Sequence, residues 1–159
     1  MKHFTIAELC ASDTARARGI DNTPPSGMTL AFTTLIEKLL DPIREAWGGP
    51  ITVNSGCRCQ KLNTTVGGAA TSQYLLGEAA DIAVGSQVDN RRLFELVVSL
   101  QKEGKIAFDQ LIDESNYKWV HISYRQGRNR GMEAVQMAHV KFCVHFIPLS
   151  IPFKNKTGW

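Results

Sequence analysis

Three side chains that could bind a metal or transfer a proton lie in or beside short strand-like segments. Asp81 stands in the middle of the apolar stretch at residues 79–84, Tyr74 precedes it by seven positions, and His121 lies in the segment KWVHISYR. A carboxylate and an imidazole that meet in a cleft can begin a catalytic zinc site, which has three protein ligands and one position for water. The alternative is an Asp–His hydrogen bond that holds a histidine in the core.

The alternation of side chains along a strand determines which of these residues can meet. Asp81 shares a face with two alanines that are too small to cover it, while Ile82 and Val84 belong to the apolar, core-facing set. In KWVHISYR, His121 shares its face with Trp119. If the two strands are neighbours in one sheet, Asp81 and His121 lie within a few ångströms of each other, as cross-strand pairs do.

Helix signals occur before and between the expected strands. Thr5 and Glu8 fit a capping box, which predicts a short helix over about residues 6–11. Apolar residues at helical spacing predict a second helix over residues 29–47, kinked at Pro42 and ended by the glycine pair that follows. A third helix is predicted to be capped by Asp89 and to stop at Gly104.

Four segments have the character of strands: residues 50–56, 79–84, 107–114 and 118–125. Together with the helices they predict a single α+β domain with a small, four-stranded antiparallel or mixed sheet. The helices are expected on one face, which leaves the other face for a cleft. We assign residues 1–131 to this domain and residues 132–159 to an atypical C-terminal tail that forms an edge strand or a packed arm.

Composition argues against several classes of function. The chain has 159 residues and a net charge of +3, with acids and bases interspersed, and it lacks the basic blocks of a nucleic-acid groove. Its amino end has no apolar core typical of a secretory signal, so we expect the protein to be cytoplasmic as synthesised. The apolar run at residues 140–153 is too short to span a membrane and contains two prolines.

Five motifs follow one another along the chain: SGCR, LN…VGG, SQYLLGEAADI, FDQLI and KWVHISY. Together they resemble the phage-type branch of the M15 family of zinc peptidases. That family includes D-alanyl-D-alanine carboxypeptidases and L,D- or D,D-endopeptidases that act on bacterial cell-wall peptides. The resemblance covers about residues 3–131. It implies a D,D-peptidase or Hedgehog-like fold, a zinc cofactor and peptidoglycan peptides as partners.

The resemblance also implies roles for individual residues. Asp81 and His121 match two of the three zinc ligands, and Arg58 matches the arginine that holds the substrate or the developing negative charge. The substrate-binding side chains that it implies are Ser55, Arg58, Gln73 and Trp119.

The chain departs from the family pattern at two other positions, Tyr74 and Lys118. Tyr74 stands where the family has the third ligand, a histidine. A phenol must lose its proton to bind a cation well, and its ordinary pKa is about 10, so it is a poorer ligand than neutral imidazole. Lys118 stands where many members have the catalytic acid, and Glu114 is the nearest alternative general base. Glu114 could equally be a solvated charge at a strand end.

Two functions remain open at this point. The first is a cell-wall hydrolase, similar to a prophage endolysin, that acts at the wall after its release from the cell. In this hypothesis Asp81, His121 and Tyr74 hold the metal, while Glu114 and Arg58 are catalytic. The second is a peptidoglycan-peptide binding or regulatory module, a pseudoenzyme that has kept the groove and lost the metal.

Overall fold

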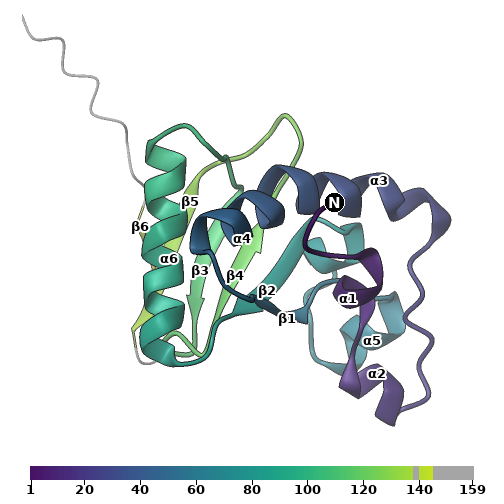
Figure 1. The fold of residues 1–159 in the computed structure, drawn as a ribbon. Helices are drawn as coiled ribbons and strands as arrows, with labels where there is room; N and C mark the ends of the chain where they lie inside the picture. The colour runs from purple at the N-terminus through teal and green to yellow at the C-terminus, as the bar shows by residue number, and fades with distance from the viewer. Residues whose placement is uncertain (138–139, 145–159) are drawn as a thin grey trace, which may run out of the picture.

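A mixed β-sheet forms the centre of the molecule (Figure 1). The computed structural model describes residues 1–137 and 140–144, and within them the sheet has six strands in the order β1-β2-β4-β3-β5-β6. The strands are β1 (Thr52–Ser55), β2 (Ala79–Ala83), β3 (Gln110–Glu114), β4 (Trp119–Ser123), β5 (Met132–Met137) and β6 (Val140–Val144). β3 and β5 are parallel, and the other neighbours are antiparallel.

Helices cover one face of this sheet and one of its edges (Figure 1). The α-helices are α1 (Ile6–Cys10), α2 (Asp13–Ala17), α3 (Thr29–Leu35), α4 (Asp41–Trp47), α5 (Gln60–Thr65) and α6 (Gln87–Lys102). Shorter helical segments are η1 (Ser26–Met28), η2 (Ile36–Leu40) and η3 (Gln73–Leu76). α4 and α6 lie across one face of the sheet, while α1, α2 and α5 gather beside β1. In the described residues, no helix is long and apolar enough to cross a membrane.

The predicted α+β class and the mixed sheet are confirmed, but the strand number is larger than the four expected. The two additional strands, β5 and β6, come from the region after residue 131. β5 joins the sheet by parallel pairing with β3. Parallel neighbours are not joined by a tight turn, so the sequence carries no hairpin signal for this pairing.

The hydrophobic core lies between the sheet and the helices on its covered face. Its sheet side includes Ala80, Ile82, Leu111, Val120 and Ile122, and its helix side includes Phe32, Leu35, Ile36, Leu39, Ile43, Leu93 and Val97. The apolar face of β2 is therefore the core face, as the alternation predicts. This leaves Asp81 and its neighbours in the row on the opposite face.

The helix predicted over residues 29–47 is divided by a wider turn. In η2 the backbone is π-helical, and the amide of Asp41 donates to the carbonyl of Ile36, five residues earlier. This π-helical segment comes just before Pro42. The proline nitrogen has no hydrogen to donate to the α-helical ladder, and the proline ring clashes with the preceding turn. The helix ends at Gly48, in the left-handed conformation at φ 75°.

The prediction that Asp89 caps the third helix was wrong. Ser86 is the N-cap of α6, and its hydroxyl accepts a hydrogen bond from the amide of Asp89 at 3.2 Å. Asp89 instead lies in the first turn, where its carboxylate accepts from the Ser86 hydroxyl at 2.7 Å. Both residue types favour helix starts, and an acidic group within the first turn also interacts well with the helix dipole.

A buried asparagine connects α6 to the two strands that carry the candidate site. Asn90 accepts a hydrogen bond from the amide of Val84 at 2.6 Å and donates to the carbonyls of Tyr117 and Lys118, both at 2.9 Å. The side chain is almost completely buried. It therefore fixes the end of β2 relative to the start of β4.

We expect Asn90→Ala to lower the free energy of unfolding by about 2 kcal/mol, because it leaves buried backbone groups without partners. Urea denaturation followed by circular dichroism would measure this loss. Gln87→Ala, an exposed change in the same helix, should stay within about 0.5 kcal/mol of the wild type. Equal stability of the two variants would show that Asn90 does not hold the strands together.

Candidate active site

One row of residues crosses the open face of the sheet. Ser55 on β1 pairs with Asp81 on β2, Asp81 pairs with His121 on β4, and His121 pairs with Ile112 on β3. Directly opposed residues point to the same face, so these side chains are neighbours. The predicted meeting of Asp81 and His121 is therefore observed, with 3.2 Å between Asp81 Oδ1 and His121 Nδ1.

The hydroxyl of Tyr74 completes a three-residue cluster with this pair. It lies 2.5 Å from Asp81 Oδ1 and 2.7 Å from His121 Nδ1. The phenol donates its single proton to Asp81 Oδ1, and the tautomer of His121 determines the direction of the second hydrogen bond, between the phenol oxygen and Nδ1. The rings of Tyr74 and His121 meet edge to face, with centroids 5.4 Å apart. We call these three residues the central cluster.

A short helical turn places Tyr74 above the sheet. Tyr74 belongs to η3, which ends at Gly77 in the left-handed conformation at φ 70°. A Cβ atom at Gly77 would lie 3.1 Å from the ring of Phe32, so the turn packs closely against α3. Glycine allows both the positive φ and this close approach.

Arg58 reaches the central cluster from a turn that only glycine permits. A Cβ atom at Gly56 would lie 2.6 Å from the carbonyl oxygen of Leu9, which accepts the amide of Cys57 in this turn. Asn22 fixes the same turn, because it donates to the carbonyl of Cys57 and accepts from the amide that follows Arg58. The backbone, rather than a flexible side chain alone, therefore directs Arg58 inward.

The guanidinium of Arg58 contacts two residues of the central cluster, Tyr74 and Asp81, and also Ser55 on β1. It stacks 3.8 Å from the centre of the Tyr74 ring and lies 3.8 Å from Asp81 Oδ2. Its Nε and Nη2 donate to the hydroxyl of Ser55 at 3.2 and 3.1 Å. These contacts combine a cation–π interaction with a partly buried ion pair.

The surroundings of Tyr74 keep its hydroxyl protonated. Burial raises its pKa most, the negative charge and hydrogen bond of Asp81 raise it further, and the charge of Glu114 adds to this. The positive charge of Arg58 acts in the opposite direction but is outweighed. The phenolate is disfavoured because a second negative charge would be desolvated beside a carboxylate.

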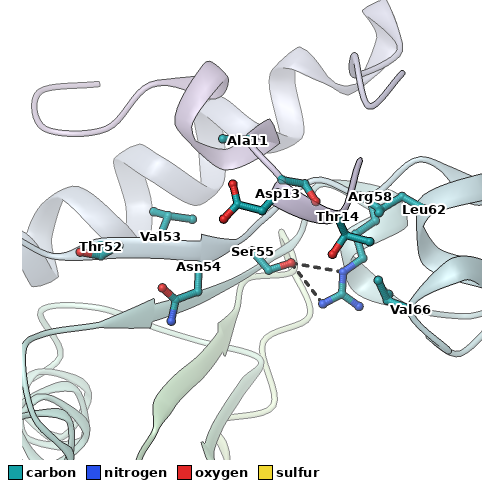
Figure 2. A pocket seen from close by; sticks show the side chains of 11 residues that line it. Ala11, Asp13, Thr14, Thr52, Val53, Asn54, Ser55, Arg58, Leu62 and Val66 are labelled. Atoms are coloured by element: carbon teal, nitrogen blue, oxygen red, sulfur yellow. Dashed lines mark hydrogen bonds between the residues drawn. The ribbon is translucent and has the colours of Figure 1, made fainter. Parts of the chain in front are cut away.

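Two cavities flank the stacked pair of Arg58 and Tyr74. The first, of about 460 Å³, lies between the start of α2, strand β1 and helix α5, and Figure 2 shows Ser55 and Arg58 in its wall. The second, of about 380 Å³, lies over β3 and β4, and its wall includes Tyr74, His121 and Glu114. We call them the β1 cavity and the β3 cavity.

Two arginines in the wall of the β3 cavity are paired with carboxylates outside it. Arg130 binds the carboxylate of Asp109 through two nitrogens, at 2.6 and 2.8 Å, and Gln73 donates to the same carboxylate at 3.1 Å. Arg125 lies 3.2 Å from a carboxylate oxygen of Glu78. Asp109 is completely buried. Its partners therefore replace the water that the carboxylate loses on folding.

These contacts set the acid sensitivity of Asp109. Burial alone would raise its pKa, but the hydrogen bonds and charge of Arg130 outweigh burial and hold the pKa below its ordinary value. The unfolded state then binds more protons than the folded state as the pH falls through about 4. The stabilising effect of Asp109 is complete above that pH and is lost as the pH falls through its lower folded-state pKa.

We therefore expect Asp109→Asn to weaken the pH dependence of stability in the acid range. Between about pH 5 and about pH 3, the wild type should lose more free energy of unfolding than the variant does. Urea titrations at several pH values would measure both slopes. Parallel curves would show that Asp109 does not titrate as its contacts require.

The structure brings together most of the residues that the sequence singled out. Ser55 and Arg58 line the β1 cavity, while Gln73, Tyr74, Glu114 and His121 line the β3 cavity. Trp119 lies opposite Glu114 in the sheet but is absent from the walls of both cavities.

Sequence reasoning missed the two arginines of the β3 cavity and Asp109, the carboxylate partner of Arg130. Asp109 directly precedes β3, and Arg125 and Arg130 follow β4, so they meet only after the strands pair. The available signal was an acidic residue at the entry of one strand and basic residues after the exit of its neighbour.

Comparison with known proteins agrees with the motifs. A region of 88 residues, 54% of this chain, is 40% identical to a zinc D-Ala-D-Ala carboxypeptidase from Streptomyces albus G. That match covers 32% of the relative, so the chain corresponds to about a third of its length. Residues 2–123 match the family model described as peptidase M15. The chain therefore belongs to the M15 family of peptidases.

Proposed function

We propose that this protein binds peptidoglycan stem peptides in the cleft of an M15 peptidase fold, and that its hydrolytic activity is weak or lost. The family assignment and the carboxypeptidase relative support a peptide as the ligand. The β1 cavity, at the edge of the sheet, and the β3 cavity, over β3 and β4, provide space for it. The position of the Tyr74 hydroxyl is the observation that favours binding over hydrolysis.

The spacing within the central cluster suits a hydrogen-bonded triad better than a zinc site. Tetrahedral zinc with bonds of about 2.0 Å holds its ligand atoms about 3.3 Å apart. Asp81 and His121 have nearly this spacing, at 3.2 Å. The Tyr74 oxygen is closer to both atoms, at 2.5 and 2.7 Å, which are hydrogen-bonding distances.

The chemistry of the third donor points in the same direction. Zinc binding by Tyr74 requires a phenolate, and the burial of Tyr74 and the charge of Asp81 both raise its pKa. Among the side chains that the structure describes, no three from His, Cys, Asp and Glu gather closely enough to hold a metal ion. The donors present therefore do not fit tightly bound zinc.

A weakly active hydrolase is the second candidate. The observation in its favour is that Glu114 and His121 line the same cavity, with Asp81 paired to His121. Glu114 would act as general base, and Arg58 would stabilise the developing negative charge. In either function we propose that the protein is made in the cytoplasm and meets its ligand at the cell wall after release.

Two measurements on the purified full chain test the proposal. Metal analysis of protein prepared without chelators should find zinc far below one atom per molecule, also after incubation with zinc and desalting. Isothermal titration with a stem peptide ending in D-Ala-D-Ala should show saturable binding in the absence of metal. Stoichiometric zinc together with peptide cleavage would favour the hydrolase, and the absence of peptide binding would contradict the proposed function.

A further inference from the structure

Two cysteine side chains meet where α1 contacts the turn that presents Arg58. Cys10 is the last residue of α1, and Cys57 directly precedes Arg58. Both are free thiols in the structure, and a hydrogen bond joins the two side chains. The two sulfur atoms are therefore neighbours although 47 positions separate them in the sequence.

The backbone holds the two cysteines at a distance that a disulfide can span. The amide of Cys57 donates to the carbonyl oxygen of Leu9 at 2.6 Å. Standard peptide geometry places that oxygen about 2.8 Å from Cα of Cys10, and the nitrogen of Cys57 about 1.5 Å from its own Cα. The two Cα atoms are therefore at most about 7 Å apart, which is the upper limit for a disulfide.

A buried asparagine fixes this approach independently of the sulfur atoms. The side-chain nitrogen of Asn22 donates to the carbonyl of Cys10 at 2.9 Å and to the carbonyl of Cys57 at 3.0 Å. One amide group thus ties together the two residues that carry the thiols. The approach is built into the fold, and a covalent bond between the thiols does not have to create it.

The two thiols differ in exposure and in acidity. Cys10 is partly exposed, whereas Cys57 is buried in the core. The hydrogen bond from Cys57 lowers the pKa of Cys10 and outweighs the opposite effect of burial. The same hydrogen bond and burial both raise the pKa of Cys57. Because the thiolate is the reactive form, Cys10 is suited to react first with a reagent from solution, and Cys57 is suited to react second.

The nearby Cys59 lies in a different environment. It is the N-cap of α5, and its sulfur accepts a hydrogen bond from the amide of Leu62 at 3.4 Å. It packs against a separate small apolar cluster and not against the core that contains Cys57. Within residues 1–137, where side chains are described, no group of three Cys, His, Asp or Glu residues is placed to hold a metal ion. Bond formation between two thiols is therefore the chemistry that the pair favours.

We propose that Cys10 and Cys57 are a site of reversible oxidation, at which a small-molecule disulfide converts the two thiols to a disulfide that fastens α1 to the Arg58 turn. The Cys10 thiolate attacks one sulfur of the reagent, forms a mixed disulfide and releases one small thiolate. Cys57 then loses its proton and attacks the Cys10 sulfur, and the second small thiol leaves. Two protein thiols are oxidised while one small disulfide is reduced to two thiols. The inference does not depend on the proposed function.

The disulfide would join two walls of the β1 cavity. Ala11, Asp13 and Thr14 follow Cys10 along one wall, and Arg58 follows Cys57 in another (Figure 2). The cross-link also restricts the unfolded chain, because it closes a long loop between α1 and the turn. We expect oxidation to raise the Tm by about 5 to 10 °C, as is typical of a disulfide in a domain of this size.

Peptide mapping of the oxidised full chain tests the site directly. The folded protein is incubated with oxidised glutathione at about pH 8, where thiolates form, and is then alkylated and digested with trypsin. Trypsin places Cys10 in the peptide 3–16, Cys57 in the peptide 45–58 and Cys59 in a third peptide. Mass spectrometry should find peptides 3–16 and 45–58 joined, and dithiothreitol should separate them. Glutathione adducts without this link, a link between other peptides, or no reaction would each overturn the inference.

Three variants test the order of the two steps and the effect on stability. Cys57→Ala should stop at a glutathione adduct on Cys10, while Cys10→Ser should leave Cys57 unmodified. Neither variant should gain Tm on oxidation. Cys59→Ser keeps a good N-cap and is the matched control, which should form the link and gain Tm as the wild type does.

The variants also separate a failed inference from a failed fold. Circular dichroism of each reduced variant shows whether it folds, and Cys10→Ser removes only a partly exposed thiol. If Cys10→Ser gains as much Tm on oxidation as the wild type, the stabilising bond lies elsewhere and the inference is wrong. Binding of a stem peptide is measured separately, so that either result leaves the proposed function to its own test.

Discussion

Tyr74→His should raise the affinity of the protein for zinc by about 100-fold or more. The change replaces a phenol, whose pKa is raised by burial and by Asp81, with an imidazole that binds zinc in its neutral form. Loss of a contact outside the ligand set already costs about 10- to 100-fold in affinity, so restoring a ligand should gain at least as much. Competition with a chromophoric chelator would measure the change, and hydrolysis of a stem peptide should rise with it.

Tyr74→Phe is the control for this prediction. It keeps the aromatic ring under Arg58, 3.8 Å from the guanidinium, but removes the oxygen that bonds to Asp81 and His121. Phenylalanine cannot coordinate zinc, so the affinity should remain at the level of the wild type or below. Equal zinc affinity in the histidine and phenylalanine variants would show that position 74 does not face the metal position.

Phe32→Ala should lower the free energy of unfolding by about 4 kcal/mol, the range found for removal of a buried phenylalanine. Phe32 is fully buried in α3, within the core between the helices and the sheet. Its ring also lies against Gly77, which ends the turn that holds Tyr74. The variant should therefore lose stability and also loosen the support of the central cluster. Urea denaturation gives the first quantity.

Leu30→Ala is a matched control on the same helix. Leu30 is also a large apolar residue of α3, but 71% of its surface is exposed. Its truncation should change the free energy of unfolding by no more than about 0.5 kcal/mol. If Phe32→Ala costs as little as Leu30→Ala, the contact between α3 and the turn at Gly77 does not contribute to the fold.

The centre of the site could be predicted because it depends on strand alternation and pairing. Small residues beside Asp81 and a histidine in a second strand pattern were enough to expect their meeting if the two strands were neighbours. The pairing of β2 with β4 meets that condition, and its register places the two residues opposite each other. The capping box of α1, formed by Thr5 and Glu8, was predictable for a similar reason, because both partners are three residues apart. Local patterns of this kind are visible in the sequence.

The parts that could not be predicted depend on contacts between distant segments. Asp109 and Arg130 are separated by 21 positions, and only the folded sheet shows that they form a bidentate pair. The five-residue helix α2, which begins after Ser12, is too short to show a helical period. The parallel pairing of β3 and β5 likewise leaves no local mark. Tertiary contacts, rather than local preference, decide each of these features.

The segment that carries Tyr74 is separate from the strands that carry its two partners. Asp81 and His121 are fixed by the backbone ladder of β2 and β4, while Tyr74 occupies a one-turn segment outside the sheet. The codons for tyrosine and histidine differ by a single base. A single point mutation can therefore exchange tyrosine and histidine at this position in either direction without rebuilding the scaffold that holds Asp81 and His121.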